Sequence, residues 1–481
     1  MGEASLKEKT AKGLFWGGVS NGLQQMLSLV FGIILARTLS QADYGMFTML
    51  LIFTTMANLL LDSGFTTALI NKKETTDADY NAVFWFSCAM GVGLYVLLFL
   101  ATPYITGWLG VPQLTTPARF LFLWFLFCST GTVHNAILVK RMMLKEKAKI
   151  EITAFLAGGV TAVVMAFNGM AYWSLFVQMV LQGFVATLLR WYFSPWKPRL
   201  TFSVAPLKVF FPFSVKLLIT GLFNALNAHI LGPLIGKYYS PAEAGRYGQG
   251  YKWGYMTYSV VWGMIHNVSQ PVLAQLVGDP QRQVPAFRKL IRFVSFIVFP
   301  GLLGLAFVAP EFITITVTDK WAESVPYMQL FCVWGAITPL NNLCANAIIS
   351  HGQSGKYMGA TIALDIVQLA VIILAHPYGL IQMVRIYVCV NLLWFFVWYT
   401  LMRRYVPVSL LTLLRDILPF LAITLAGISI SWLLVTSIDN LYLRFILKIA
   451  VTAAIYIGVL YLCHAVVLRE SIQFLKKQFK R

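Results

Sequence analysis

Fourteen hydrophobic stretches of roughly membrane-spanning length, separated by short polar turns, account for almost all of this 481-residue chain. A helix that crosses a bilayer needs about 20 apolar residues, so the spans can be counted directly. Hydrophobic residues make up 58% and charged residues 11%, a balance that a water-soluble domain could not place on its surface. The sequence therefore predicts an all-α polytopic membrane protein. The expected spans are 13–39, 45–70, 81–103, 117–139, 150–168, 172–190, 209–236, 247–275, 290–310, 324–349, 357–375, 380–402, 414–436 and 443–466.

The formal charge of +19 comes from basic residues placed mainly on one side of the membrane. Of 37 Lys and Arg residues, 27 fall in segments expected inside, and four fall outside. This asymmetry follows the positive-inside rule and predicts that both termini are cytoplasmic. The loops 140–149 and 278–289 are then cytoplasmic, and 103–117 and 311–323 are periplasmic. The distribution of the charge therefore indicates orientation in a membrane, and no nucleic-acid partner is expected.

A short internal repeat predicts how the spans are grouped. Ser40-Gln41-Ala42-Asp43-Tyr44-Gly45 follows the first span, and Ser240-Pro241-Ala242-Glu243-Ala244-Gly245 follows the seventh. Locally, a Ser followed three residues later by an acidic residue is typical of a capping box. The spacing predicts two six-helix lobes, 1–200 and 201–405, related by pseudo-two-fold symmetry around a central cavity. Residues 406–481 then supply two extra helices and a basic cytoplasmic tail.

Polar residues within the spans are the candidates for substrate binding, because a charge in the bilayer centre costs roughly 3 kcal/mol on insertion scales. Helical spacing places several of them on shared stripes. The candidate cavity residues are Asn21 and Gln25 in the first span, Lys216 and Asn227 in the seventh, and Lys252 and His266 in the eighth. The eighth span also carries Tyr255 and Ser259 on the same stripe, and its many aromatic residues suit either sugar stacking or an interfacial belt.

Each charged candidate has a second interpretation. Lys216 and Lys252 lie close enough to an interface to reach lipid headgroups by snorkelling. Arg37, near the outer end of the first span, either contacts substrate or clamps the outer turn through Asp43. Asp62 and Asp365 are the carboxylates expected inside spans; they either couple transport to H⁺ or Na⁺ or neutralise nearby bases. No cofactor or metal is expected, because the six cysteines show no metal or redox spacing.

The first part of the chain, up to Trp85, carries a set of motifs: Gly13-Leu14-Phe15-Trp16, the run from Ile34 to Ser40, Asp43-Tyr44-Gly45, Asp62-Ser63-Gly64-Phe65, Ala68-Leu69-Ile70 and Phe84-Trp85. With these motifs the chain resembles the polysaccharide-exporter family, which includes O-antigen, colanic-acid and teichuronic-acid flippases of the multidrug/oligosaccharidyl-lipid/polysaccharide superfamily.

The resemblance implies a flippase in the bacterial inner membrane, and not an enzyme. Its substrate would be an undecaprenyl-pyrophosphate-linked oligosaccharide moved from the cytoplasmic to the periplasmic leaflet by alternating access. Polysaccharide polymerase and glycosyltransferases would be its partners, beside membrane lipids. Two alternatives remain at this point: a cation-coupled multidrug exporter of the same superfamily, and a membrane-embedded polysaccharide polymerase or ligase.

Overall fold

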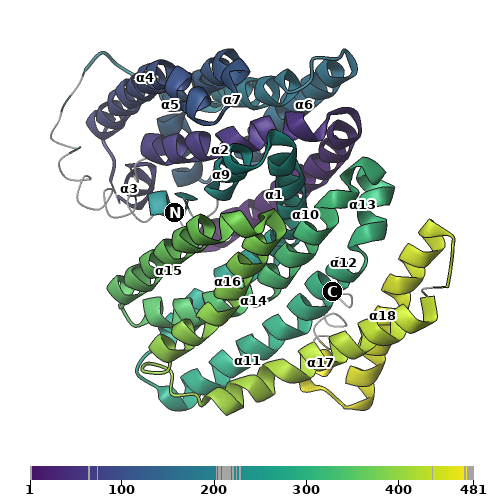
Figure 1. Cartoon of the computed structure of the whole chain (residues 1–481). Helices are drawn as coiled ribbons and strands as arrows, with labels where there is room; N and C mark the ends of the chain where they lie inside the picture. Colours follow the sequence, from purple (N-terminus) through teal and green to yellow (C-terminus); the bar gives the residue numbers. More distant parts are fainter. Residues whose placement is uncertain are drawn as a thin grey trace. The chain divides into compact units, whose positions relative to one another are not determined.

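The computed structural model describes residues 3–62, 65–72, 74–201, 229–435 and 437–470, with isolated positions between 203 and 226 and at 473. In these residues every regular element is helical (Figure 1). The chain forms two compact units, Met1–Gly245 and Arg246–Arg481. The prediction of an all-α polytopic membrane protein is confirmed. The domain boundaries at 200 and 405 stay a prediction.

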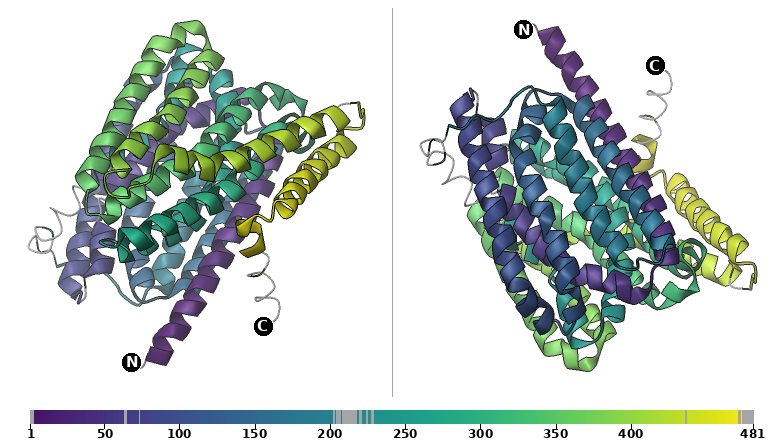
Figure 2. Two further views of the ribbon diagram at one scale, coloured as in Figure 1. Left: turned by 90° about the horizontal axis from the view of Figure 1, so that it is seen from below. Right: turned by 90° about the horizontal axis from the view of Figure 1, so that it is seen from above.

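Long antiparallel helices build the first unit. They are α1 (Glu3–Thr38), α2 (Gln41–Asp62), the short α3 (Phe65–Asn71), α4 (Asp77–Trp108), α5 (Thr115–Lys140), α6 (Leu144–Phe167), α7 (Trp173–Phe193) and α9 (Leu231–Tyr238). The helix α5 packs between α4 and α7, and α6 lies between α7 and α1. The N-terminal part of α1 extends as the long purple helix of Figure 2.

The second unit continues from α10 (Pro241–Gln275), which starts just before the unit boundary. Its other elements are α11 (Pro280–Val298), a π-helical turn η2 (Phe299–Leu303), α12 (Gly304–Phe307), α13 (Ala309–Val317), α14 (Val325–Ser350), α15 (Ser354–Ala375), α16 (Leu380–Met402), α17 (Leu410–Val435) and α18 (Leu441–Leu462). The helix α14 packs on α16 and α11, and α17 and α18 form a hairpin (Figure 2).

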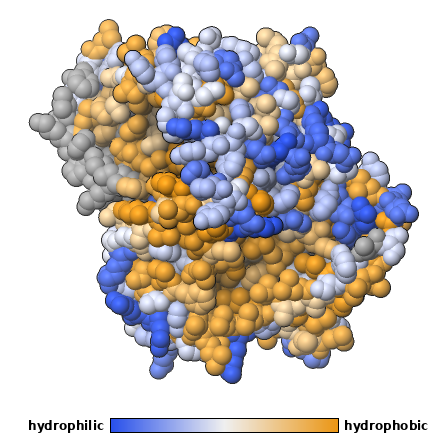
Figure 3. Space-filling view, in the orientation of Figure 1, coloured by the Kyte–Doolittle hydropathy of each residue, from blue (hydrophilic) through white to orange (hydrophobic). Residues whose placement is uncertain are grey.

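Twelve helical segments among the described residues are long and apolar enough to cross a membrane. They match twelve of the fourteen expected spans. Half of the expected span 209–236 lies outside the described residues, and its last part includes the start of α9. The expected span 247–275 is helical as part of α10, but Gly, Tyr, Ser and amide residues make it more polar than the other twelve. Figure 3 shows broad apolar surface over the helices, with hydrophilic residues gathered in patches and at the rims.

The two copies of the six-residue repeat pack against each other in a reciprocal contact. A Cβ added at Gly45 would overlap the carbonyl oxygen of Pro241, and one added at Gly245 would overlap that of Gln41. Each added Cβ would also lie 3.0 Å from the backbone nitrogen of the other glycine. Glycine is required at both positions because the two helix starts touch through their backbones. Residues 200 apart therefore play equivalent roles, as the repeat predicts.

The capping function of the repeat is also confirmed. In the first copy, Ser40 N donates to Asp43 Oδ2 at 2.9 Å, and Asp43 N donates to Ser40 Oγ at 3.1 Å. In the second copy, Glu243 N donates to Ser240 Oγ at 3.1 Å. These side chains satisfy backbone groups that a helix start leaves without intrahelical partners.

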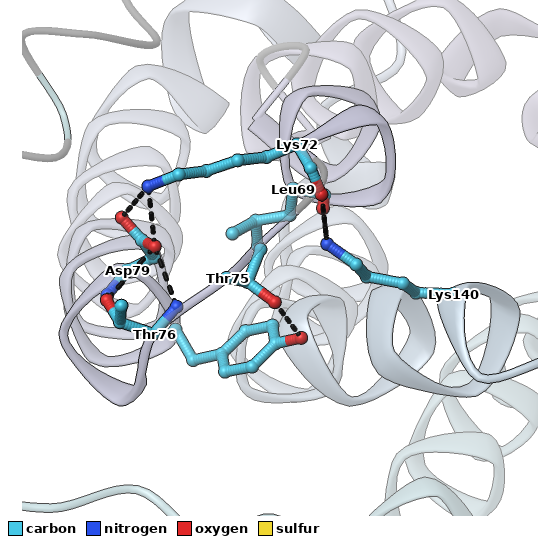
Figure 4. Close-up of polar contacts among 7 residues, drawn as sticks. Leu69, Lys72, Thr75, Thr76, Asp79 and Lys140 are labelled. Carbon is cyan, nitrogen blue, oxygen red and sulfur yellow. Dashed lines mark hydrogen bonds and ion pairs between the residues drawn. The ribbon is translucent and has the colours of Figure 1, made fainter.

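Two lysines of the predicted cytoplasmic surface hold the turn between α3 and α4 (Figure 4). Lys72 Nζ donates to both carboxylate oxygens of Asp79, at 2.8 and 2.7 Å, and Asp79 also completes the capping box of Thr76. Lys140 Nζ donates to the carbonyl oxygen of Leu69 at 2.9 Å and to that of Lys72. Both ammonium groups already satisfy protein groups, so this cluster has a structural role and is not a candidate substrate site.

The glycine contact generates a stability prediction. Gly45→Ala should lower the free energy of unfolding by about 1–3 kcal/mol, because the added methyl forces two backbones apart. Thermal unfolding of the purified protein in detergent measures this. Gly93→Ala is the matched control: Gly93 lies in α4 with open space around the added Cβ, so alanine should leave stability unchanged or raise it. Equal stability of the two variants would show that the contact contributes nothing.

Candidate functional site

Several ionisable groups of the second unit are neutralised by partners within it. Buried Asp416 on α17 accepts from Arg288 Nε at 2.6 Å and from Arg292 Nε at 2.7 Å, both on α11. Buried Glu311 on α13 lies 2.7 Å from Lys448 Nζ and 2.9 Å from Arg444 Nε, both on α18. These ion pairs fasten α17 and α18 to the rest of the unit.

Glu311 and Asp416 are buried carboxylates that the sequence analysis did not single out, although the expected span 414–436 contains Asp416. Asp416 lies in a membrane-spanning helix, and Glu311 is 3% exposed in α13. Both were missed because each stands near a span end, where a sequence alone does not distinguish a solvated carboxylate from a buried one. A basic pair one helical turn apart on each partner helix, Arg288 with Arg292 and Arg444 with Lys448, was the available signal.

One side of α10 is packed tightly against α14. A Cβ at Gly250 would lie 2.7 Å from the backbone nitrogen of Met328, and one at Gly254 would lie 2.9 Å from Phe331 Cβ. At 100° per residue, Lys252, Tyr255 and Ser259 project from the opposite side of the helix. The two glycines therefore fix which residues of α10 are turned away from α14. We call Lys252, Tyr255 and Ser259 the α10 face.

An aromatic stack borders the α10 face. The Tyr251 ring stacks on Tyr247, with centroids 6.1 Å apart, and on Tyr255, with centroids 5.5 Å apart. Behind them, Asn342 Nδ2 donates to Tyr258 Oη at 3.1 Å. Tyr251 is partly buried, whereas Tyr255 is 44% exposed and ends the stack. The stack therefore holds the Tyr255 ring in place and leaves part of that ring exposed.

Lys252 is the cation of this face. Its side chain is partly buried, and its Nζ lies 5.4 Å from the ring centroid of Trp253. No carboxylate pairs with it among the residues the structure describes, in contrast to Lys448, which is held by Glu311. A cation without a counter-charge inside a membrane protein is suited to bind an anion that comes from outside.

In the first unit, the polar residues of α1 divide into two groups. Ser20 Oγ and Gln24 Nε2 each donate to Glu151 Oε2 on α6 at 3.2 Å, so these two side chains connect α1 to α6. Asn21 is exposed and Gln25 is partly exposed, and neither hydrogen-bonds to another described residue. The two predicted residues therefore take no part in this contact between α1 and α6, and their role in binding stays a prediction.

Asp365 lies in a buried polar cluster on α15 and α16. It is 5% exposed, and Gln368, one turn further along α15, is 2% exposed. Gln368 Nε2 donates to Asn391 Oδ1 at 2.9 Å, and Asn391 Nδ2 donates to the carbonyl oxygen of Tyr387 at 2.8 Å. The cluster brings carboxylate and amide oxygens together inside the unit, which is a chemistry that suits a proton or Na⁺.

The remaining predicted residues are placed incompletely. Lys216 and Asn227 lie outside the described residues. The backbones of Asp62 and His266 belong to α2 and α10, but their side chains are not described. Arg37 is exposed in the last turn of α1; its contact with Asp43 stays a prediction.

Comparisons with known proteins agree with the fold and with the motifs. The chain is 27% identical over 402 residues to the lipopolysaccharide biosynthesis protein WzxC of Escherichia coli, covering 77% of this chain and 81% of that protein. It is 24% identical to the succinoglycan biosynthesis transport protein ExoT of Rhizobium meliloti, covering 64% of this chain and 62% of that protein.

The fold is that of a solved flippase. A structure of the lipid II flippase MurJ in an inward closed conformation aligns with a TM-score of 0.74 at 13% identity, covering 95% of this chain and all of that one. At that identity the likeness shows the fold alone, and it confirms the expected two-lobe architecture. The model of the family described as polysaccharide biosynthesis protein matches residues 34–326, well over half of the sequence. The chain therefore belongs to this polysaccharide biosynthesis protein family.

Proposed function

We propose that this protein is a flippase that moves an undecaprenyl-pyrophosphate-linked oligosaccharide from the cytoplasmic to the periplasmic leaflet of the bacterial inner membrane. The family membership supports a role in polysaccharide biosynthesis, and the flippase fold supports transport rather than catalysis. The same two observations disfavour the alternatives. A polymerase or ligase has no reason to share a flippase fold, and a drug exporter has no reason to match a polysaccharide family.

The observation that carries the proposal is Lys252 on the α10 face. The pyrophosphate of such a lipid must shed water to cross the membrane and needs replacement partners for its charge. Lys252 offers a cation with no carboxylate partner among the described residues, and Tyr255 offers an open aromatic ring one helical turn away. The C–H faces of a sugar ring pack well on such a ring, whose faces are electron-rich.

The first test is glycan export in a strain that lacks its own flippase. Lys252→Ala and Tyr255→Ala should each lower export about tenfold or more, since each removes an interaction worth roughly 1.5–3 kcal/mol in a desolvated site. Lys252→Arg and Tyr255→Phe should retain most of it. Lys149→Ala, an exposed lysine in the loop end of α6, is the matched control and should export normally. Full complementation by the Lys252→Ala, Tyr255→Ala double variant at normal protein levels would refute the assignment.

We also propose that both termini are cytoplasmic, on the strength of the basic-residue asymmetry. Single cysteines introduced at Lys145 and Asp319 in a cysteine-free background should then label from opposite sides. A membrane-impermeant maleimide added to intact spheroplasts should modify the Asp319 position alone, because the loop at 145 is on the inner side. Labelling of both positions before lysis would overturn the topology. Partnership with polysaccharide polymerase and glycosyltransferases belongs to the same proposal, as the enzymes that extend and supply the glycan.

Ion coupling through Asp365 is a further part of the proposal. Its support is the burial of the carboxylate beside the Gln368 and Asn391 amides. Asp365→Asn should abolish the dependence of transport on a proton or sodium gradient in proteoliposomes, leaving downhill exchange intact. Asp62→Asn is measured in parallel, and Asp319→Asn, an exposed carboxylate outside the spans, is the control. If both Asn variants keep the gradient dependence of the wild type, neither aspartate couples an ion.

A further inference from the structure

Arg385 is a second cation within a membrane-spanning helix that lacks a carboxylate partner in the described part of the chain. It lies on α16, five residues after the helix begins at Leu380, and its side chain is exposed. The contact it makes is polar and weak: Arg385 Nη1 donates to Gln382 Oε1 at 3.4 Å. Arg385 therefore places an exposed guanidinium near the start of α16, without an internal ion pair among the described residues.

A groove of about 360 Å³ opens beside Arg385 within the second unit. Its lining comes from five elements, η2, α12, α14, α16 and α17, and most of the lining residues are aliphatic or aromatic, among them Leu303, Phe307, Leu330, Val333, Leu425 and Ile428. Gln329 also lines it, but Gln329 Nε2 donates to the carbonyl oxygen of Ala306 at 3.1 Å. Arg385 is the one charged residue in the lining. The groove is therefore apolar along its length, with a cation as its charged contact.

The potential around this groove is positive. Lys448 Nζ lies 4.5 Å from the ring centroid of Phe307, a wall residue. The cluster of Glu311, Arg444 and Lys448 carries one more positive than negative charge. Both the exposed guanidinium and this cluster favour a negatively charged occupant.

The groove also lies at one depth. It is formed by η2 with α12, the start of α14, the start of α16 and the second half of α17. In the predicted topology, all these parts lie next to connections on the same side of the membrane. In that topology the side is periplasmic. A lipid whose charged headgroup is close to its acyl chains would place the headgroup at Arg385 and an acyl chain between the apolar walls of the groove.

We propose that this groove is a binding site for one anionic glycerophospholipid of the surrounding bilayer. Its phosphate accepts hydrogen bonds from the Arg385 guanidinium, and one acyl chain lies against Phe307, Val333 and Ile428. Arginine binds phosphate oxygens in a bidentate fashion, and acyl chains gain dispersion contacts in a preformed apolar groove. The site involves no residue of the α10 face.

Native mass spectrometry of the full-length protein, titrated with phosphatidylglycerol or with phosphatidylcholine of the same chains, tests the proposal. The wild type should bind the first phosphatidylglycerol at least fivefold more tightly than phosphatidylcholine. Arg385→Gln should remove that preference, and Arg385→Lys should keep part of it. Ile428→Trp, which fills the groove and leaves the charge, should weaken both lipids. Arg404→Gln removes an exposed arginine just beyond the other end of α16 and should bind as the wild type does.

Thermal unfolding in detergent separates loss of the site from loss of the fold, and only variants that unfold within a few degrees of the wild type are compared. Unchanged lipid preference in Arg385→Gln would overturn the proposal. So would an equal loss in Arg404→Gln, which would indicate general surface charge. Displacement of phosphatidylglycerol by equimolar undecaprenyl phosphate would assign the groove to a polyprenyl lipid and refute the phospholipid. Retained binding in Ile428→Trp would place the lipid elsewhere.

Discussion

An uncompensated charge in a medium without water costs much free energy, and this cost explains how the ionisable side chains of this structure are paired. Each ionisable side chain within the helices must be matched by a partner or be reserved for a ligand. Asp416 and Glu311 are each matched by two bases, whereas Lys252 and Arg385 have no carboxylate partner among the described residues. The division into matched and unmatched charges separates structural groups from candidate binding groups more sharply than position along a helix does.

Much of the fold follows from the sequence, because span length and hydropathy are direct consequences of bilayer thickness. The twelve apolar helices fall where the hydrophobic stretches predict them, and the Ser40 and Ser240 caps do as well. The helix α10 was expected as a span and is helical, but it is not among the twelve helices that are apolar enough to cross a membrane by composition. That polarity has a physical cause: its glycines pack on α14, while its opposite face carries Lys252 and Tyr255.

The site was predictable in part. Stripes on a helix follow from its period, so the grouping of Lys252 with Tyr255 could be inferred. The sequence could not show that Ser20 and Gln24 bind Glu151 of α6 whereas Asn21 and Gln25 do not, because this depends on where Glu151 lies. Glu311 and Asp416 were missed because both stand near span ends and their partners are far along the chain, although the basic pairs one turn apart on α11 and α18 were a local signal.

The ion pairs of α17 and α18 have a consequence for how the protein is made. Asp416 is 128 residues from Arg288, and Lys448 is 137 residues from Glu311. During synthesis α11 and α13 therefore enter the membrane long before their counter-charges leave the ribosome. Until then the half-built unit must keep three charged side chains wet, at the bilayer edge or shielded by the insertion machinery. The α17–α18 hairpin supplies the missing partners, so the second unit can mature only after this hairpin has been made.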